Sequence, residues 1–178
     1  MPTRTRTDPP PRWLALLPLL WLLAGCGGEA QAPGPRVGEP FPALDIPGLD
    51  RDPLRLGELR DRLVVLNLWA TWCAPCREEM PALQRLSRRH PDGRLTVIGL
   101  SVDEDLNLVR EFLLKYAIDF PVAIDPGGAL ADGVLGVRAY PDTFIIAPGG
   151  KLVERIGGSR AWDGEEMVSL LEKWLPGR

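Results

Sequence analysis

The sequence predicts an α/β domain built on one mixed, mostly parallel sheet with helices on both faces. Two observations support this prediction. Near-continuous apolar runs alternate with amphipathic helical patterns, which is typical of parallel strands joined by helical crossovers. The last two apolar runs instead flank Pro148-Gly149-Gly150, a turn sequence that predicts an antiparallel hairpin at one edge of the sheet.

The first half of the domain contains two strand–helix units. Leu63 to Trp69 is apolar except for one Asn, which predicts a central strand buried on both faces. A helix is expected from Ala74 to about Arg89, with a kink at Pro81. Leu95 to Val102 is a second buried strand, and Asp105 to Ala117 has the apolar spacing of an amphipathic helix.

The second half contains shorter elements. A strand is expected over Pro121 to Ile124 and a helix over Ala129 to Leu135. Thr143 to Ala147 and Lys151 to Ile156 are the predicted hairpin strands. A last helix runs from about Asp163, the expected N-cap, to Leu175, where Pro-Gly ends it.

Composition excludes several classes of protein. The chain has 178 residues, 45% hydrophobic and 25% charged, which argues against collagen, coiled coil and wholesale disorder. A domain of this length buries a core without disulfide support. Its 21 basic and 24 acidic residues form no basic stripe, so nucleic acid is not an expected partner.

The N-terminus has the pattern of an export signal. Arg4, Arg6 and Arg12 precede an apolar run from Trp13 to Ala24, which is too short for a mature membrane-spanning helix. The run ends in Leu23-Ala24-Gly25-Cys26, which resembles the lipobox of bacterial lipoprotein signal peptides. The alternatives are an ordinary signal peptide with small residues at its cleavage site and an uncleaved anchor.

The lipobox resemblance implies cleavage before Cys26 and acylation of that residue. The chain then divides into a signal peptide (1–25), a lipid-anchored Pro/Gly-rich tether (26–36) and one domain (37–178). Cleavage removes three Arg and one Asp, which leaves 18 basic and 23 acidic residues and a net charge of −5. Lipid rather than basic charge would therefore hold the domain to a bacterial cell envelope, facing the periplasm or extracytoplasmic space.

The other two cysteines carry the predicted chemistry. Cys73 and Cys76 lie three residues apart at a strand-to-helix junction, where they can close a small disulfide ring. Unpaired amides at a helix N-terminus favour a thiolate at Cys73, while Cys76, one turn inside, is shielded. Pro75 suits the first helical turn because its missing N–H has no partner there. Cys73 is thus the expected attacking thiolate and Cys76 the resolving thiol.

Two other uses of the cysteine pair fit less well. A zinc site needs more Cys or His ligands, and only His90 and Cys26 remain, so no metal is expected. A purely structural disulfide would close a loop of a few residues and so constrain the unfolded chain little. Redox exchange is the favoured interpretation.

The motif and its surroundings resemble a known family. Trp72-Cys73-Ala74-Pro75-Cys76 after a buried strand resembles the active site of thioredoxin-fold oxidoreductases. The wider pattern from Leu66 to Pro81 is similar to the TlpA/ResA-like branch of membrane-tethered, extracytoplasmic thiol–disulfide oxidoreductases. The similarity runs from about Val37 to the C-terminus. It implies a thioredoxin fold with an extra strand and helix at 121–135.

Further roles follow from this resemblance. Glu79 matches a glutamate near the cysteines, which as a half-buried carboxylate would exchange protons with the thiols. Pro141 matches the cis-proline opposite the pair, and the backbone at Tyr140 would pair with a substrate strand. Trp72 would shield the disulfide and contact partners. With Trp72, the residues Pro75, Tyr140 and Pro141 form the expected substrate-binding set.

Three other polar features carry weaker expectations. Asn67 stands where thioredoxin has a buried acid, so proton handling falls to Glu79 or water. Asp103-Glu104-Asp105 is expected to cap the helix that follows it. His90, the single histidine, is expected to be a solvent-facing residue at a helix C-terminus.

The leading functional prediction is a lipid-anchored reductant of disulfides in exported proteins. Apocytochrome c is a candidate substrate suggested by the resemblance, and a membrane thiol protein would supply electrons. No cofactor is expected beyond the redox-active disulfide. One alternative is a thiol peroxidase of the peroxiredoxin type, which Thr71 fits only in part because no Pro precedes it. A thioredoxin-fold copper chaperone is a weaker alternative. In those proteins three residues stand between the cysteines, where this chain has two, and the histidine ligand lies late in the chain, whereas His90 precedes the hairpin.

Overall fold

The computed structural model describes residues 34–177, which contain a five-stranded sheet in the order β5-β4-β3-β6-β7. Parallel pairing joins β3 to β4 and β4 to β5, and β6 runs antiparallel to both β3 and β7. The predicted mixed sheet with an edge hairpin is therefore confirmed. The signal peptide, Cys26 and most of the tether lie outside the described residues. The strands are β3 (Leu63–Trp69), β4 (Leu95–Ser101), β5 (Val122–Ile124), β6 (Asp142–Ala147) and β7 (Lys151–Gly157).

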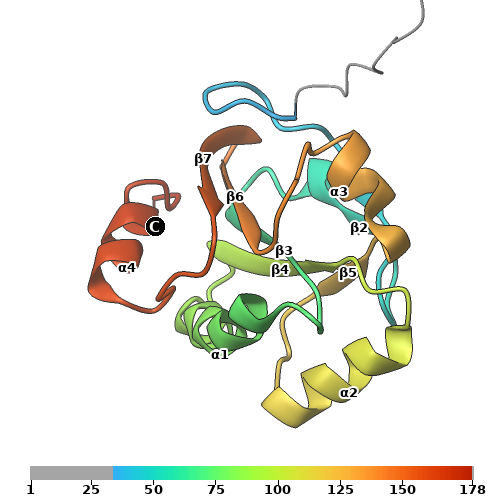
Figure 1. Cartoon of the computed structure of the whole chain (residues 1–178). Helices are drawn as coiled ribbons and strands as arrows, with labels where there is room; N and C mark the ends of the chain where they lie inside the picture. The colour runs from blue at the N-terminus through green and yellow to red at the C-terminus, as the bar shows by residue number, and fades with distance from the viewer. Residues whose placement is uncertain (1–33, 178) are drawn as a thin grey trace, which may run out of the picture. The chain divides into compact units, whose positions relative to one another are not determined.

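Helices cover both faces of this sheet, as expected. The two crossovers, β3-α1-β4 and β4-α2-β5, both move across the sheet toward β5. Because such connections are right-handed, α1 and α2 lie on the same face of the sheet. Figure 1 shows them on one side of the sheet and α3 on the other. The α-helices are α1 (Ala74–Arg89), α2 (Leu106–Tyr116), α3 (Ala129–Gly133) and α4 (Glu165–Glu172), with short 3₁₀ turns η2 (Leu56–Glu58) and η3 (Pro126–Gly128).

The central strand β3 positions the cysteine motif. All seven of its residues are buried, because helices cover one face and the N-terminal segment and α3 pack toward the other. Trp69, at its end, packs against Phe112 of α2 with ring centroids 5.1 Å apart. Gly99 of β4 makes room for this indole, since a Cβ there would come within 2.9 Å of Trp69 Nε1. A fully buried, closely packed strand therefore ends just before the cysteine motif.

The segment before β3 contains structure that no sequence pattern predicted. Two-residue strands β1 (Asp45–Ile46) and β2 (Leu54–Arg55) form a small antiparallel sheet. The amide of Gly38 donates to Leu152 O of β7, and the amide of Leu49 donates to Val122 O of β5. The segment therefore supplies hydrogen-bond partners at both edges of the main sheet, where unpaired strand groups would otherwise be exposed.

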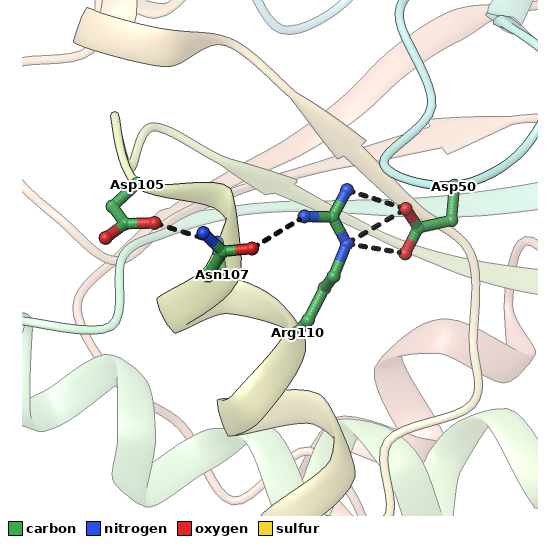
Figure 2. A network of polar contacts seen from close by, with 4 residues as sticks. All are labelled: Asp50, Asp105, Asn107 and Arg110. Carbon is green, nitrogen blue, oxygen red and sulfur yellow. Dashed lines mark hydrogen bonds and ion pairs between the residues drawn. The ribbon is translucent and has the colours of Figure 1, made fainter.

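A polar network links the same segment to α2. Arg110 donates to both carboxylate oxygens of Asp50, at 2.7 to 3.1 Å, and from Nη1 to Asn107 Oδ1 at 3.3 Å (Figure 2). The amide of Asn107 in turn donates to Asp105 Oδ1, the N-cap of α2. Because the ion pair is largely exposed, it adds little stability, but it defines how the first turn of α2 meets the loop after β1.

Two capping predictions need correction. Asp163 is not the N-cap of the last helix: Gly164 occupies that position without a side-chain bond. The Asp163 carboxylate instead accepts from Arg85 Nε of α1 at 2.6 Å, so a tertiary ion pair replaces the local cap. In the acidic triplet before α2, Asp105 is the cap, as expected, whereas Asp103 is buried and bonds elsewhere.

Candidate functional site

The cysteine pair lies where β3 passes into α1. Cys73 is the N-cap of this helix, Cys76 lies in its first turn with Pro75 between them, and their sulfurs form a disulfide. The amide of Cys76 points at Cys73 Sγ, 3.3 Å away, so a helix N-terminal donor faces this sulfur. Cys73 keeps 6% of its surface exposed and Cys76 none. Partner access to Cys73 alone agrees with the expected division of labour, which stays a prediction.

The predicted substrate-binding residues gather beside the disulfide. The Tyr140–Pro141 peptide bond is cis, as the resemblance implied. The rings of Trp72 and Tyr140 meet edge to face, with centroids 5.9 Å apart and planes at 81°. This contact brings the cis-proline segment next to the cysteine motif, although Tyr140 lies 68 residues after Trp72 in the sequence. Trp72 remains 65% exposed and is therefore available to a partner.

A groove opens next to these two aromatic rings. It has a volume of about 450 Å³, and its lining includes Trp72 and Tyr140 together with Leu108 and Glu104 from the region around the start of α2. Trp72 and Leu108 are both exposed apolar side chains. The groove is shallow and open, which suits a segment of polypeptide rather than an enclosed small molecule.

Glu79 is more buried than the sequence suggested. Only 2% of it is exposed, in place of the expected half-buried carboxylate, because the loop before α4 covers this part of α1. Its Oε2 accepts from the indole N–H of Trp162 at 2.8 Å and from the amide of Arg160 at 3.0 Å. Its Oε1 accepts from Asn67 Nδ2 at 2.8 Å. Glu79 lies three residues after Cys76, on the same side of the helix.

Burial shifts the acidity of this carboxyl. Desolvation raises the pKa of Glu79 above its ordinary value of 4.5, because the charged form loses water. The hydrogen bonds from Trp162, Arg160 and Asn67 act in the opposite direction and offset part of that rise. The result is a carboxyl that holds its proton to higher pH than an exposed glutamate does, which suits proton exchange with a thiol.

Asn67 lies beside Glu79 and binds it directly. Its Nδ2 donates to Thr143 Oγ1 at 2.9 Å as well as to Glu79. Asn67 of β3 and Thr143 of β6 are directly paired partners in the sheet. Asn67 Oδ1 is buried and has no hydrogen-bond partner within the described residues. Asn67 thus lies next to the glutamate as a non-titrating donor, and the assignment of proton handling to Glu79 or to water stays a prediction.

Sequence reasoning missed Trp162, Arg160 and Thr143 as partners of this site. Trp162 is fully buried, although it lies in a loop between Gly158 and Gly164. A large aromatic side chain outside every predicted element was the available signal, because such a side chain needs burial against some other part of the domain. Its partner could not be named, since Glu79 lies 83 residues earlier.

The remaining predicted features lie away from the disulfide or outside the described part. His90 is the C-cap of α1, where burial lowers its pKa. Residues 34–177 contain no group of three His, Cys, Asp or Glu side chains placed to hold a metal ion. In the same residues, no helix is both long and apolar enough to cross a membrane. Cys26 falls in the part of the chain that the structure does not describe.

Comparison with known proteins identifies the family. The model of the AhpC/TSA family matches residues 37–155. Thiol-disulfide oxidoreductase ResA of Bacillus thuringiensis (strain Al Hakam) is 34% identical over 141 residues, which cover 79% of this chain and 80% of the relative. Thioredoxin-like protein YneN of Bacillus subtilis is 33% identical over 144 residues, covering 76% and 83%.

Solved structures agree with this assignment. A thioredoxin-family thiol:disulfide interchange protein from Chlorobium tepidum superposes with a TM-score of 0.64 at 25% identity, covering 74% of this chain and 94% of that one. A second Chlorobium tepidum protein, proposed to be the interchange protein DsbE, superposes with a TM-score of 0.70 at 25% identity, covering 80% and 100%. The chain therefore belongs to the AhpC/TSA family of thioredoxin-fold proteins and, among them, to the ResA-like thiol–disulfide oxidoreductases.

Proposed function

We propose that this oxidoreductase is a lipid-anchored reductant of disulfides in exported proteins. The observation that carries the proposal is the Cys73–Cys76 disulfide at the N-terminus of α1, beside an exposed Trp72 and a cis-proline. One sulfur is reachable and the other is shielded, which is what a sequential exchange between two proteins requires.

The proposed reaction passes two electrons to the substrate. In the reduced protein, the Cys73 thiolate attacks one sulfur of a substrate disulfide, forming a mixed disulfide and releasing the other substrate sulfur as a thiolate that takes up a proton. Cys76 then loses its proton and attacks Cys73 Sγ. The second substrate thiolate leaves and is protonated, and the Cys73–Cys76 disulfide remains.

Glu79 is the proposed proton acceptor for Cys76. Its raised pKa lies closer to that of a thiol than an exposed carboxyl's would, which makes transfer in either direction easier. Trp162 and the amide of Arg160 hold Oε2 of Glu79 in place, and Asn67 holds Oε1, so the carboxylate does not need to reorient between turnovers.

Substrate binding is assigned to the surface beside the disulfide. An extended segment of the substrate would pair with the backbone at Tyr140, while its neighbouring side chains contact Trp72 and enter the groove that Leu108 also lines. Tyr140 fills part of this surface and narrows the choice of substrate. Apocytochrome c is a candidate, because the resemblance to the TlpA/ResA-like branch suggests it.

The proposed direction of electron flow predicts a low reduction potential. Equilibration with a glutathione buffer is expected to place the Cys73–Cys76 couple near the roughly −270 mV of thioredoxin, because a reductant must hold its disulfide in the oxidised form more stably than its substrates do. A value near the roughly −120 mV of the strong oxidant DsbA would contradict the proposal. Peroxide consumption faster than disulfide reduction in the same preparation would favour a thiol peroxidase instead.

The proposed membrane anchor rests on Cys26, which lies outside the described residues. In a bacterial host, the full chain is expected to incorporate labelled palmitate and to sediment with membranes, whereas Cys26→Ala should do neither. A Cys73→Ala chain is the matched control, because it also loses one cysteine but keeps the lipobox. Equal labelling of the full chain and Cys26→Ala would show that Cys26 is not the anchor. In the proposed cycle, a membrane thiol protein re-reduces the anchored domain after each turnover.

A further inference from the structure

Asp103, two residues after the end of β4, has a buried carboxylate that binds Thr71 in the turn before the cysteine motif. It is 3% exposed. Its Oδ1 accepts from the Thr71 hydroxyl at 2.6 Å, and its two oxygens share the Thr71 amide at 3.2 and 3.0 Å. Its Oδ2 also accepts from the Ser101 hydroxyl at 2.7 Å. Nearly all of its hydrogen-bonding capacity is thus spent on the turn before Cys73 and on the end of β4.

The turn that Asp103 holds is the connection between β3 and α1. The amide of Cys73 donates to Ala70 O at 3.2 Å, which closes the turn around Thr71. On the other side, the amide of Val102 donates to Trp69 O at 3.1 Å, so the backbone next to Asp103 is itself fixed to β3. A side chain on this rigid base therefore restrains a turn that carries both Trp72 and Cys73.

We propose that Asp103 is a positioning residue for Cys73: by binding the amide and the hydroxyl of Thr71, it keeps the Cys73 sulfur at the N-terminus of α1. The inference rests on the proposed role of Cys73 as the attacking thiolate. It gives Asp103 a role distinct from the helix capping that the sequence suggested, which Asp105 performs alone.

Position matters here because the stabilisation of a thiolate by a helix is local. The favourable field and the free amides act within the first turn, so a small displacement of Cys73 loses much of their effect. The direct charge of Asp103 acts in the opposite sense. A carboxylate near Cys73 repels a thiolate, so its removal by charge alone would make the thiolate easier to form.

Loss of position and loss of charge at Asp103 therefore change the pKa of Cys73 in opposite directions, so the direction of the measured shift distinguishes them. The test uses the full chain carrying Cys26→Ala, so that no third thiol reacts, with its Cys73–Cys76 disulfide reduced. The rate constant for the reaction of iodoacetamide with Cys73 is then measured as a function of pH. Asp103→Ala, which removes all four hydrogen bonds, is expected to raise the pKa of Cys73 by about one unit. The alkylation rate should then fall about tenfold at pH values below the pKa of Cys73 in the parent. Asp103→Asn removes the charge but keeps one oxygen that can accept from the Thr71 amide, and the one hydroxyl that faces the new NH2 group can turn to accept from it. This variant should therefore react at least as fast as the parent.

A second pair of variants tests the other end of the contact. Thr71→Val removes the hydroxyl that donates to Asp103 Oδ1 and is expected to slow alkylation in the same direction, whereas Thr71→Ser should restore the parent rate. This pair decides the question if Asp103→Ala fails to fold. Asp105→Ala is the matched control, because it removes a nearby carboxylate that caps α2 and makes no hydrogen bond to Thr71, and it should leave the pH profile unchanged.

Three results would overturn the proposal. Faster alkylation in both Asp103→Ala and Asp103→Asn would show that charge, not position, dominates. A lower unfolding midpoint with an unchanged pH profile would show that the contact is merely structural. Equal rates in Thr71→Val and Thr71→Ser would show that the hydroxyl bond does not matter. Because iodoacetamide replaces the protein substrate, these outcomes do not depend on the proposed substrates or on the direction of electron flow.

Discussion

Replacing Cys73 with serine is expected to reduce the disulfide-reducing activity of this protein at least a thousandfold, to the level of the buffer. Serine keeps the size and the N-cap position, but its hydroxyl does not ionise near neutral pH and cannot form a mixed disulfide. Insulin reduction, followed as precipitation of the free B chain, measures the loss. Cys26→Ala, which leaves the redox pair intact, should retain the parent rate.

The Cys76→Ser variant should fail in a different way. Its Cys73 still attacks, but the shielded partner that resolves the intermediate is absent, so about one equivalent of substrate stays attached. Mass spectrometry under non-reducing conditions detects this adduct, and dithiothreitol should release it. If Cys73→Ser reduced insulin at the parent rate, or if Cys73→Ser rather than Cys76→Ser accumulated the substrate adduct, the assigned order of attack would be wrong.

Replacing Glu79 with glutamine is expected to lower turnover with a protein disulfide by about 100-fold, the usual contribution of a positioned proton acceptor. The loss should fall on the resolving step, so that mixed disulfides accumulate, while alkylation of Cys73 changes much less. Glu78→Gln is the matched control, because Glu78 is the adjacent residue in the same helical turn and its carboxylate is exposed. Equal turnover in the two variants would remove Glu79 from the mechanism.

The same substitution has a consequence for the pH dependence of stability. Because burial raises the pKa of Glu79 above 4.5, the folded protein holds this proton more tightly than the unfolded chain does. The resulting stabilisation is complete below pH 4.5 and is lost as pH rises through the raised value. Urea unfolding across this range should show that Glu79→Gln removes the decline, so that the variant gains stability relative to the parent as pH rises. A parallel decline in both proteins would contradict the assigned pKa direction.

Much of this fold could be predicted because its main elements carry strong local patterns. The apolar run from Leu63 to Trp69 is the observed β3, residue for residue, and α1 begins and ends at the expected residues. The two-residue strands β1 and β2 were missed, since two residues have no period. Asp163 was wrongly placed as a cap because the competing partner, Arg85, is 78 residues away in sequence.

The site was predictable to the extent that its chemistry is contained in one short motif. The cysteine pair and the following glutamate lie within one helix, and the cis-proline was expected from the family pattern. The environment of Glu79 was not predictable, because Asn67 and Trp162 reach it from segments on either side of the helix in the sequence. The depth of its burial, and hence its acidity, is a property of tertiary packing alone.

The hydrogen bond between Trp162 and Glu79 joins a titrating group to a chromophore. The indole N–H donates directly to Oε2, so the charge on the carboxylate alters both the proton chemical shift of that N–H and the electronic environment of the buried ring. Trp72, by contrast, lies exposed next to the disulfide. Two of the six tryptophans of this chain therefore report on different events, Trp162 on the charge of the proton acceptor and Trp72 on the state of the redox pair.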